Sequence, residues 1–251
     1  MNPEFYNPLH AARTLGDRCI VSAATEPAYF ERMHATRLYC HRWAPEAWQL
    51  FYYGYPDGCP TQAQHQYAFK IHALRRPVAA GFRTILWMDT AFQPVASMQP
   101  LWDEIETNGW YVPAQGSSVL GRWCSDAALD VFGIDRDAAM NIPLVFSGLV
   151  GFRIDHPIGR EIWDTWERLC ATGCFDGPHY NAPNKIMEPL GQKIKGWCSN
   201  DPRCEGHRHD EAALSFILWK LGLEPGRKPW LEVEGNRGFI GYHRELQVKE
   251  S

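Results

Sequence analysis

The apolar positions of this chain follow two kinds of period. Largely apolar runs at 19–25, 48–53 and 84–88 predict strands, and the last of them, continuous from Ile85 to Met88, is typical of a strand buried on both faces of a parallel sheet. Between these runs, the segments 28–43 and 66–80 carry apolar residues at helical spacing. Strand and helix alternate through the first ninety residues, which predicts a doubly wound α/β fold.

The rest of the chain predicts shorter elements. Helices are expected at 101–106, 127–132, 136–140, 158–171 and 212–221, and strands at 110–112 and 145–152. Trp163 and Trp166 lie on one face of the helix at 158–171 and are expected in the core. The segment 173–208 shows no sustained period, and a loop of that length is either a lid over a ligand or a surface loop.

A single acid, Asp89, follows the third predicted strand. In open α/β sheets ligands bind in the crevice beyond the carboxyl ends of the strands, so Asp89 is a candidate site residue. The alternative is that it caps a turn, as Asp often does. Thr25 ends the first strand in the same way, and Lys70 lies on the helix before Asp89, where it is either a site residue or a solvated lysine.

A second polar cluster, Gly206-His207-Arg208-His209-Asp210-Glu211, precedes the apolar helix at 212–221. Acids in a first helical turn are favoured by the helix dipole, and this alone would explain Asp210 and Glu211. Five charged or ionisable residues in succession also suit a catalytic site. Both interpretations of the cluster stay open on the sequence.

These two stretches carry a resemblance. The apolar strand ending in Asp89, with Tyr67-Ala68-Phe69-Lys70 before it, resembles the metal-site strand of GT-A-type nucleotide-sugar glycosyltransferases of bacteria and phages. That strand ends in Asp-x-Asp, whose acids hold a divalent cation on the donor diphosphate. Here Ala91 replaces the second acid. The stretch 199–203, together with 206–211, resembles a second segment of the same family, in which Gln usually stands at the position of Glu211.

The resemblance implies a GT-A-like α/β fold with a mixed central sheet flanked by helices. It implies a Rossmann-type half that binds the nucleotide-sugar, at about 18–112, and an acceptor half at 113–251, which contains the loop 173–208. The implied reaction moves a sugar from a nucleotide-sugar to a hydroxyl acceptor, which is a glycan, a protein or a hydroxymethylated base in DNA. Whether the configuration of the sugar is inverted or retained stays open.

The resemblance also implies roles for particular residues. Asp210 is the expected catalytic carboxylate, as a base or as a group that orients the sugar, and His209 is expected to help neutralise the leaving diphosphate. The expected donor-binding residues are Thr25, Lys70, Asp89 and Arg208, and the expected acceptor-binding residues are Ser147, Gly148 and Glu211. The expected metal ligands are Asp89 and His243, with Mn²⁺ as the cation because it suits carboxylate and imidazole.

Composition narrows the setting. The 251 residues are 45% hydrophobic and 22% charged, with a formal charge of -4, which fits a soluble globular protein and not a strongly basic nucleic-acid binder. We expect no signal peptide, because the first residues show neither a basic nor an apolar region of that kind. We expect no membrane span, because no window approaches about 18 apolar residues. The eight scattered cysteines are then expected as free thiols of a cytoplasmic protein, in a bacterium or a phage-infected host.

Two alternatives remain. The missing second acid is compatible with a non-catalytic module that binds nucleotides or sugars. Cys198, Cys204, His207 and His209 are also usable zinc ligands, although their spacing is not that of a standard finger.

Overall fold

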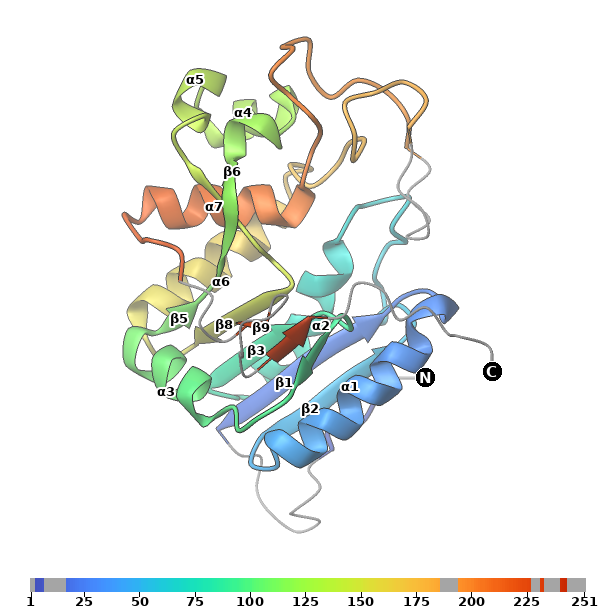
Figure 1. The fold of residues 1–251 in the computed structure, drawn as a ribbon, viewed down its shortest axis with the longest axis vertical. Coiled ribbons are helices and arrows are strands. Elements are labelled where there is room, and N and C mark those ends of the chain that lie inside the picture. Colours follow the sequence, from blue (N-terminus) through green and yellow to red (C-terminus); the bar gives the residue numbers. More distant parts are fainter. Residues whose placement is uncertain (1–2, 7–16, 186–193, 227–230, 233–239, 243–251) are drawn as a thin grey trace.

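The computed structural model describes residues 3–6, 17–185, 194–226, 231–232 and 240–242 (Figure 1). The central sheet has the strand order β2-β1-β3-β8-β5. β1 pairs in parallel with β2 and β3, whereas β8 is antiparallel to β3 and β5, so the sheet is mixed as expected. Its strands are β1 (Arg18–Ala24), β2 (Trp48–Tyr53), β3 (Thr84–Met88), β5 (Trp110–Tyr111) and β8 (Leu149–Arg153).

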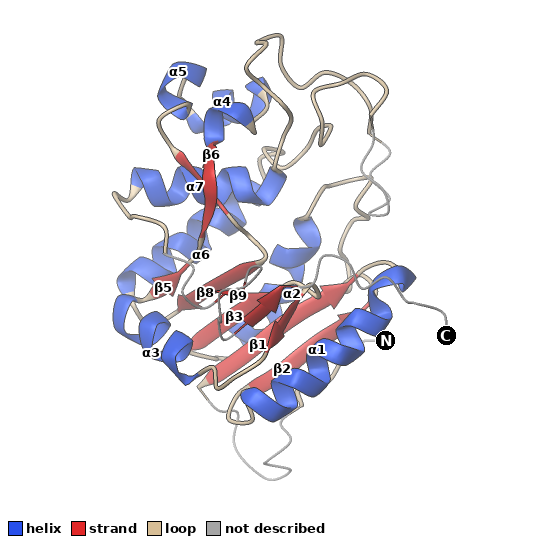
Figure 2. Ribbon diagram, viewed as in Figure 1, coloured by secondary structure: helices blue, strands red, loops and turns tan. Residues whose placement is uncertain are grey.

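Helices cover both faces of this sheet (Figure 2). Successive strand residues point to opposite faces, so Ile20 and Leu86 belong to one hydrophobic cluster and Val21 and Trp87 to another. The first cluster includes residues of α1 and α3, and the second includes residues of α2, α6 and α7. The long helices are α1 (Phe30–Trp43), α2 (Ala68–Ala79), α3 (Gln99–Asn108), α6 (Pro157–Cys170) and α7 (His209–Lys220).

A smaller unit extends from the edge of the sheet (Figure 1). β6 (Ala114–Val119) and β7 (Pro143–Val145) form an antiparallel ribbon that packs on α7. The short helices α4 (Asp126–Phe132) and α5 (Arg136–Ala139) follow β6. The remaining elements are the 3₁₀ turns η1 (Pro27–Tyr29) and η2 (Leu120–Arg122), and a three-stranded sheet of β4 (Phe92–Pro94), β10 (Ile240–Tyr242) and β9 (Leu231–Glu232).

The structure corrects two predicted elements. The strand expected at 145–152 is two strands, β7 and β8, which belong to different sheets because the chain leaves the ladder at Phe146, Ser147 and Gly148. The helix expected at 212–221 begins three residues earlier, at His209. The expectation that Trp163 and Trp166 lie in the core is confirmed, since both are buried.

Two further properties concern the cysteines and the length and polarity of the helices. All eight cysteines are free thiols. Every helix within the described ranges is too short or too polar to span a lipid bilayer.

Candidate active site

A pocket lies where the chain reverses direction across the sheet. β1 sits between β2, which follows it in sequence, and β3, which comes later, so the strand order switches at β1. The carboxyl ends of β1 and β3 open into the pocket, which is the position where open α/β sheets bind ligands. Its walls are formed by Ala23, Thr25, Tyr29, Arg32, Tyr67, Phe69, Lys70, Asp89, Thr90, Ala91, Gln115, Phe146, Ser147, His179, Arg208, His209, Asp210 and Glu211.

Lys70 contacts Asp89, Ser147 and Asp210, three residues of this pocket that are far apart in sequence. Its Nζ lies 2.9 Å from Asp210 Oδ2 and 3.4 Å from Asp89 Oδ1, and it donates to Ser147 Oγ at 3.0 Å. The carbonyl oxygen of Ser147 lies 3.1 Å away. Only 1% of the Lys70 side chain is exposed. An ammonium has three donors, and the described oxygens around Lys70 can accept all three, so Lys70 holds two carboxylates in place. Its expected contact with the donor stays a prediction.

The charge of Lys70 depends on these carboxylates. Burial lowers the pKa of Lys70, but the charges of Asp210 and Asp89 outweigh burial and leave the pKa raised. Burial raises the pKa of Asp210, and Lys70 is the main group that opposes this effect. The structure therefore contains a buried ion pair in which removal of Lys70 would leave Asp210 without a described cation within 4 Å of its carboxylate.

Asp89 is the more accessible of the two acids. Its side chain is 34% exposed, while Oδ1 accepts a hydrogen bond from Trp87 Nε1 at 2.7 Å. Its backbone nitrogen donates to the carbonyl of Gly148 at 2.8 Å. A Cβ at Gly148 would lie 2.6 Å from the ring of Phe92 and 3.1 Å from Asp89 Oδ2. Gly148 therefore allows β8 to approach Asp89, although it does not line the pocket itself.

Glu211 has a different environment from its neighbour Asp210. No described Lys, Arg or His nitrogen lies within ion-pair distance of its carboxylate. With the amide of Gln115 oriented so that its nitrogen faces the two acceptors, Gln115 donates to Glu211 Oε2 at 3.1 Å and to Val145 O at 3.2 Å. Burial, followed by the charge of Asp210, raises the pKa of Glu211 to about 8. Glu211 is therefore mostly protonated at neutral pH.

Arg208 is held by stacking and by a directed chain of hydrogen bonds. Its guanidinium lies 4.1 Å from the ring centroid of Trp123 and contacts His179 Nε2. His179 Nδ1 lies 3.3 Å from His209 Nε2, and His209 Nδ1 lies 2.7 Å from the carbonyl of Phe175. A carbonyl only accepts, so the proton positions follow in order: His209 donates to Phe175, His179 to His209, and Arg208 to His179.

This chain of hydrogen bonds argues against the role expected for His209, which was to neutralise the leaving diphosphate. Both ring nitrogens are bonded within the protein and the side chain is fully buried. Burial, followed by the neighbouring His207 and His179, holds the pKa of His209 well below its usual value. A neutral imidazole cannot offset the charge of a diphosphate. The structure instead makes His209 part of the support for Arg208.

Two residues beside the pocket have left-handed backbones. Tyr67 has φ 56° and stands at the N-terminal cap of α2, and His209 has φ 49° and begins α7. Their rings stack on each other at 5.1 Å. Such a backbone costs a non-glycine residue about 1–3 kcal/mol and occurs mostly at functional sites. The pair fixes how the helices carrying Lys70 and Asp210 begin.

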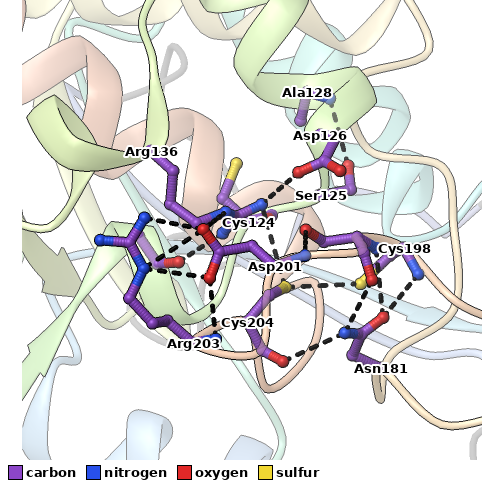
Figure 3. A network of polar contacts seen from close by, with 12 residues as sticks. Cys124, Ser125, Asp126, Ala128, Arg136, Asn181, Cys198, Asp201, Arg203 and Cys204 are labelled. Carbon is purple, nitrogen blue, oxygen red and sulfur yellow. Dashed lines mark hydrogen bonds and ion pairs between the residues drawn. The ribbon is translucent and has the colours of Figure 1, made fainter.

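The described part of the predicted loop reaches the pocket through His179 and is fastened elsewhere by ion pairs (Figure 3). Arg136 contacts Asp126 at 2.5 Å and Asp201 at 3.9 Å, and Arg203 contacts Asp201 and Asp137, both at 2.7 Å. These contacts tie the segment before α7 to α4 and α5. Whether the loop acts as a lid stays a prediction.

The four residues of the zinc alternative do not converge. Cys198 and Cys204 place their sulfurs 3.8 Å apart (Figure 3), but His207 Nε2 lies 2.8 Å from the carbonyl of Cys174. Its Nδ1 accepts from the backbone of Ser125. In the part of the chain that the structure describes, no group of three His, Cys, Asp or Glu side chains is arranged to hold a metal ion.

Asp89 is the one expected metal ligand among the described residues. Asp89 reaches the pocket, whereas Ala91 supplies no ligand there. His243 lies outside the described residues. One carboxylate with phosphate oxygens and waters is a common arrangement for such cations, so Asp89 fits a cation that the donor would help to bind.

The structure brings most expected residues together and adds others. Thr25, Lys70, Asp89, Ser147, Arg208, Asp210 and Glu211 all line the pocket. Sequence reasoning missed Tyr29 and Arg32 on the first helical stretch, Gln115 on β6 and His179 in the loop. The spacing of Tyr29 and Arg32, three residues apart, was the one available signal that they share a helix face.

Comparisons with known proteins agree on the architecture. No protein-family model matches the sequence, and no curated protein sequence is similar to it. The structure superposes on the bifunctional glycosyltransferase WbbM with a TM-score of 0.50 and 8% identity, over 96% of this chain and 47% of WbbM. The fold is of the GT-A type.

A second structure is similar over its whole length. Mouse xyloside xylosyltransferase 1 gives a TM-score of 0.47 at 9% identity, over 91% of this chain and 98% of that one. The present chain spans about half the length of WbbM. At these identities the likeness concerns the GT-A fold alone, and the chemistry must be argued from the pocket.

Proposed function

We propose that this protein is a glycosyltransferase that moves a sugar from a nucleotide-sugar to a hydroxyl acceptor. The proposal rests on one observation. Asp89 and Asp210 both contact the buried ammonium of Lys70 at the carboxyl ends of the strands. The two acids are far apart in sequence and are brought together by the fold. A charged cluster of this kind at a ligand-binding edge favours a functional site.

The donor would lie along the cationic side of the pocket. Thr25, Tyr29 and Arg32 are among the lining residues, and Tyr29 suits the nucleotide because an aromatic ring can stack on a base. Arg208, oriented by Trp123 and His179, is placed to offset charge that develops on the diphosphate. Mn²⁺ or a similar cation at Asp89 would neutralise the same charge when it is bound.

Asp210 would then act near the reacting carbon. It is 1% exposed and fixed by Lys70, so it presents a carboxylate whose position is set before the ligand arrives. In an inverting reaction it would take the proton of the acceptor hydroxyl, and in a retaining one it would orient the sugar. The acceptor remains a glycan, a protein or a hydroxymethylated DNA base.

The test combines binding and turnover. We expect nucleotide-sugars to raise the melting temperature of the protein in the presence of Mn²⁺, and transfer or slow donor hydrolysis to accompany binding. Asp89→Asn should abolish the Mn²⁺-dependent part of donor binding while the protein stays folded. Asp130→Asn, an exposed acid on α4 outside the pocket, is the matched control.

The outcomes separate the two functional classes. Binding with neither transfer nor hydrolysis would favour a non-catalytic nucleotide- or sugar-binding module, for which Ala91 in the pocket is the supporting observation. No response to any nucleotide or nucleotide-sugar would contradict both.

A further inference from the structure

The two acids in the first turn of α7, Asp210 and Glu211, have different polar partners in the pocket. Asp210 has an ammonium 2.9 Å away, whereas the only described polar partner of the Glu211 carboxylate is the uncharged amide of Gln115. That amide donates to Oε2 and leaves Oε1 available. An ionised Glu211 would place a further uncompensated charge beside Asp210. The arrangement fits a carboxyl group that accepts at one oxygen and carries a proton on the other.

We propose that Glu211 works as a neutral carboxylic acid that donates a hydrogen bond to a hydroxyl oxygen of a sugar in the pocket, an assignment that rests on the proposed sugar transfer. A hydroxyl oxygen is uncharged and accepts such a bond. A phosphate oxygen is a poorer partner at this wall, because Asp210 and Asp89 would repel it. Glu211 is therefore assigned to sugar binding, and the diphosphate to Arg208.

The protonation state of Glu211 is set by its burial and by the charged groups around it. With its pKa raised to about 8, roughly nine in ten copies of Glu211 carry the proton at pH 7. Burial and the charges of Asp210 and Asp89 favour the proton, and the charges of Arg208 and Lys70 oppose it. The polar groups that line the pocket with Glu211 are Asp210 and His209 on α7, Arg208 directly before α7, Lys70 on α2, Tyr67 directly before α2, Asp89 after β3, Gln115 on β6 and His179 in the loop.

The first test compares Glu211→Gln with Glu211→Ala. Glutamine keeps one donor and one acceptor, so transfer at pH 6.5 should stay within about threefold of wild type, whereas alanine should lose about tenfold or more. Above pH 8 the wild-type rate should fall by about tenfold per pH unit as Glu211 ionises, and the glutamine variant should lack this decline. A glutamine variant as slow as the alanine variant would overturn the proposal, because an ionised carboxylate would then be required.

The second test needs no substrate and so separates this proposal from the proposed function. The pKa of Glu211 is raised in the folded state, so wild type releases a proton on unfolding between about pH 4.5 and 8. Its folded-to-unfolded ratio should therefore fall relative to Glu211→Gln by up to about tenfold per pH unit in this window. Denaturant titrations at several pH values measure the ratio, with the exposed Glu224→Gln as control.

The results of the two tests are read separately. A stability difference between wild type and Glu211→Gln that does not change with pH would overturn the neutral-acid assignment, whether or not the protein transfers sugar. Absence of transfer by wild type, with the expected pH dependence present, would overturn the proposed function and with it the sugar as the partner of Glu211, while the protonated state would stand.

Discussion

Replacing Lys70 with methionine tests the centre of the pocket without any knowledge of the substrate. Methionine keeps the length and apolar stem of lysine but removes the ammonium. Asp210, which is 1% exposed, would lose the one described cation within 4 Å of its carboxylate. Asp89 would lose much less, because 34% of its side chain is exposed and Trp87 still donates to it. The cost should therefore come almost entirely from Asp210.

The cost has an upper limit that the proton sets. A buried, unpaired carboxylate takes up a proton, and doing so at pH 7 from an unfolded-state pKa of 3.8 costs at most about 4.4 kcal/mol. At pH 5 the same limit is about 1.6 kcal/mol. The folded-state pKa of Asp210 rises in the variant, so its stability relative to wild type must decrease as pH increases. Breaking buried pairs elsewhere costs about 3–5 kcal/mol, which agrees with the pH 7 limit.

Urea unfolding at pH 5 and pH 7 measures both values. We expect a loss of about 3–4 kcal/mol at pH 7, or roughly 6–16 °C in melting temperature for a chain of this size, and about 1–1.5 kcal/mol at pH 5. Lys70→Met combined with Asp210→Asn should recover much of the loss and remove its pH dependence. The exposed Lys220→Met is the control and should change stability by less than about 0.5 kcal/mol. A loss below about 1 kcal/mol at pH 7, or one independent of pH, would refute the buried ion pair.

Two further predictions concern turnover. Asp210→Asn should lower transfer by about 100-fold or more with little change in donor affinity, as expected for loss of a general base; near-wild-type transfer would mean that Asp210 only supports the start of α7. Excess chelator should reduce transfer reversibly, because Asp89 is the one expected metal ligand among the described residues and the donor must help to hold the metal. Full activity in chelator would mean that Arg208 and Arg32 alone neutralise the diphosphate.

The sequence predicted the sheet better than the pocket, for a physical reason. Buried strands such as β1 and β3 are continuous apolar runs, and that pattern is local. The end of a strand is local too, which is why Thr25 and Asp89 were found. The break between β7 and β8 was missed because Phe146, Ser147 and Gly148 are apolar or small, like the strands they separate. Only pairing with two different sheets reveals the break.

The chemical state of the site residues depended on contacts that no local pattern encodes. Lys70 was recognised as a site residue, but its partners Ser147 and Asp210 lie 77 and 140 positions further along the chain. The family resemblance implies that His209 helps to neutralise the leaving diphosphate. In space His209 is enclosed by Phe175 and His179, whose loop shows no periodicity, and so it is neutral.

The ammonium of Lys70 also bears on how the chain can be divided. A fragment that ended near residue 112 would retain the central parallel strands and Asp89, but it would lack Ser147 and Asp210. Its lysine would then keep one described counter-ion, the partly exposed carboxylate of Asp89. The proposed boundary between the nucleotide and acceptor halves would therefore separate two functions but not two independently stable parts. Two separately produced fragments would have to associate before Lys70 and Asp210 could form their ion pair.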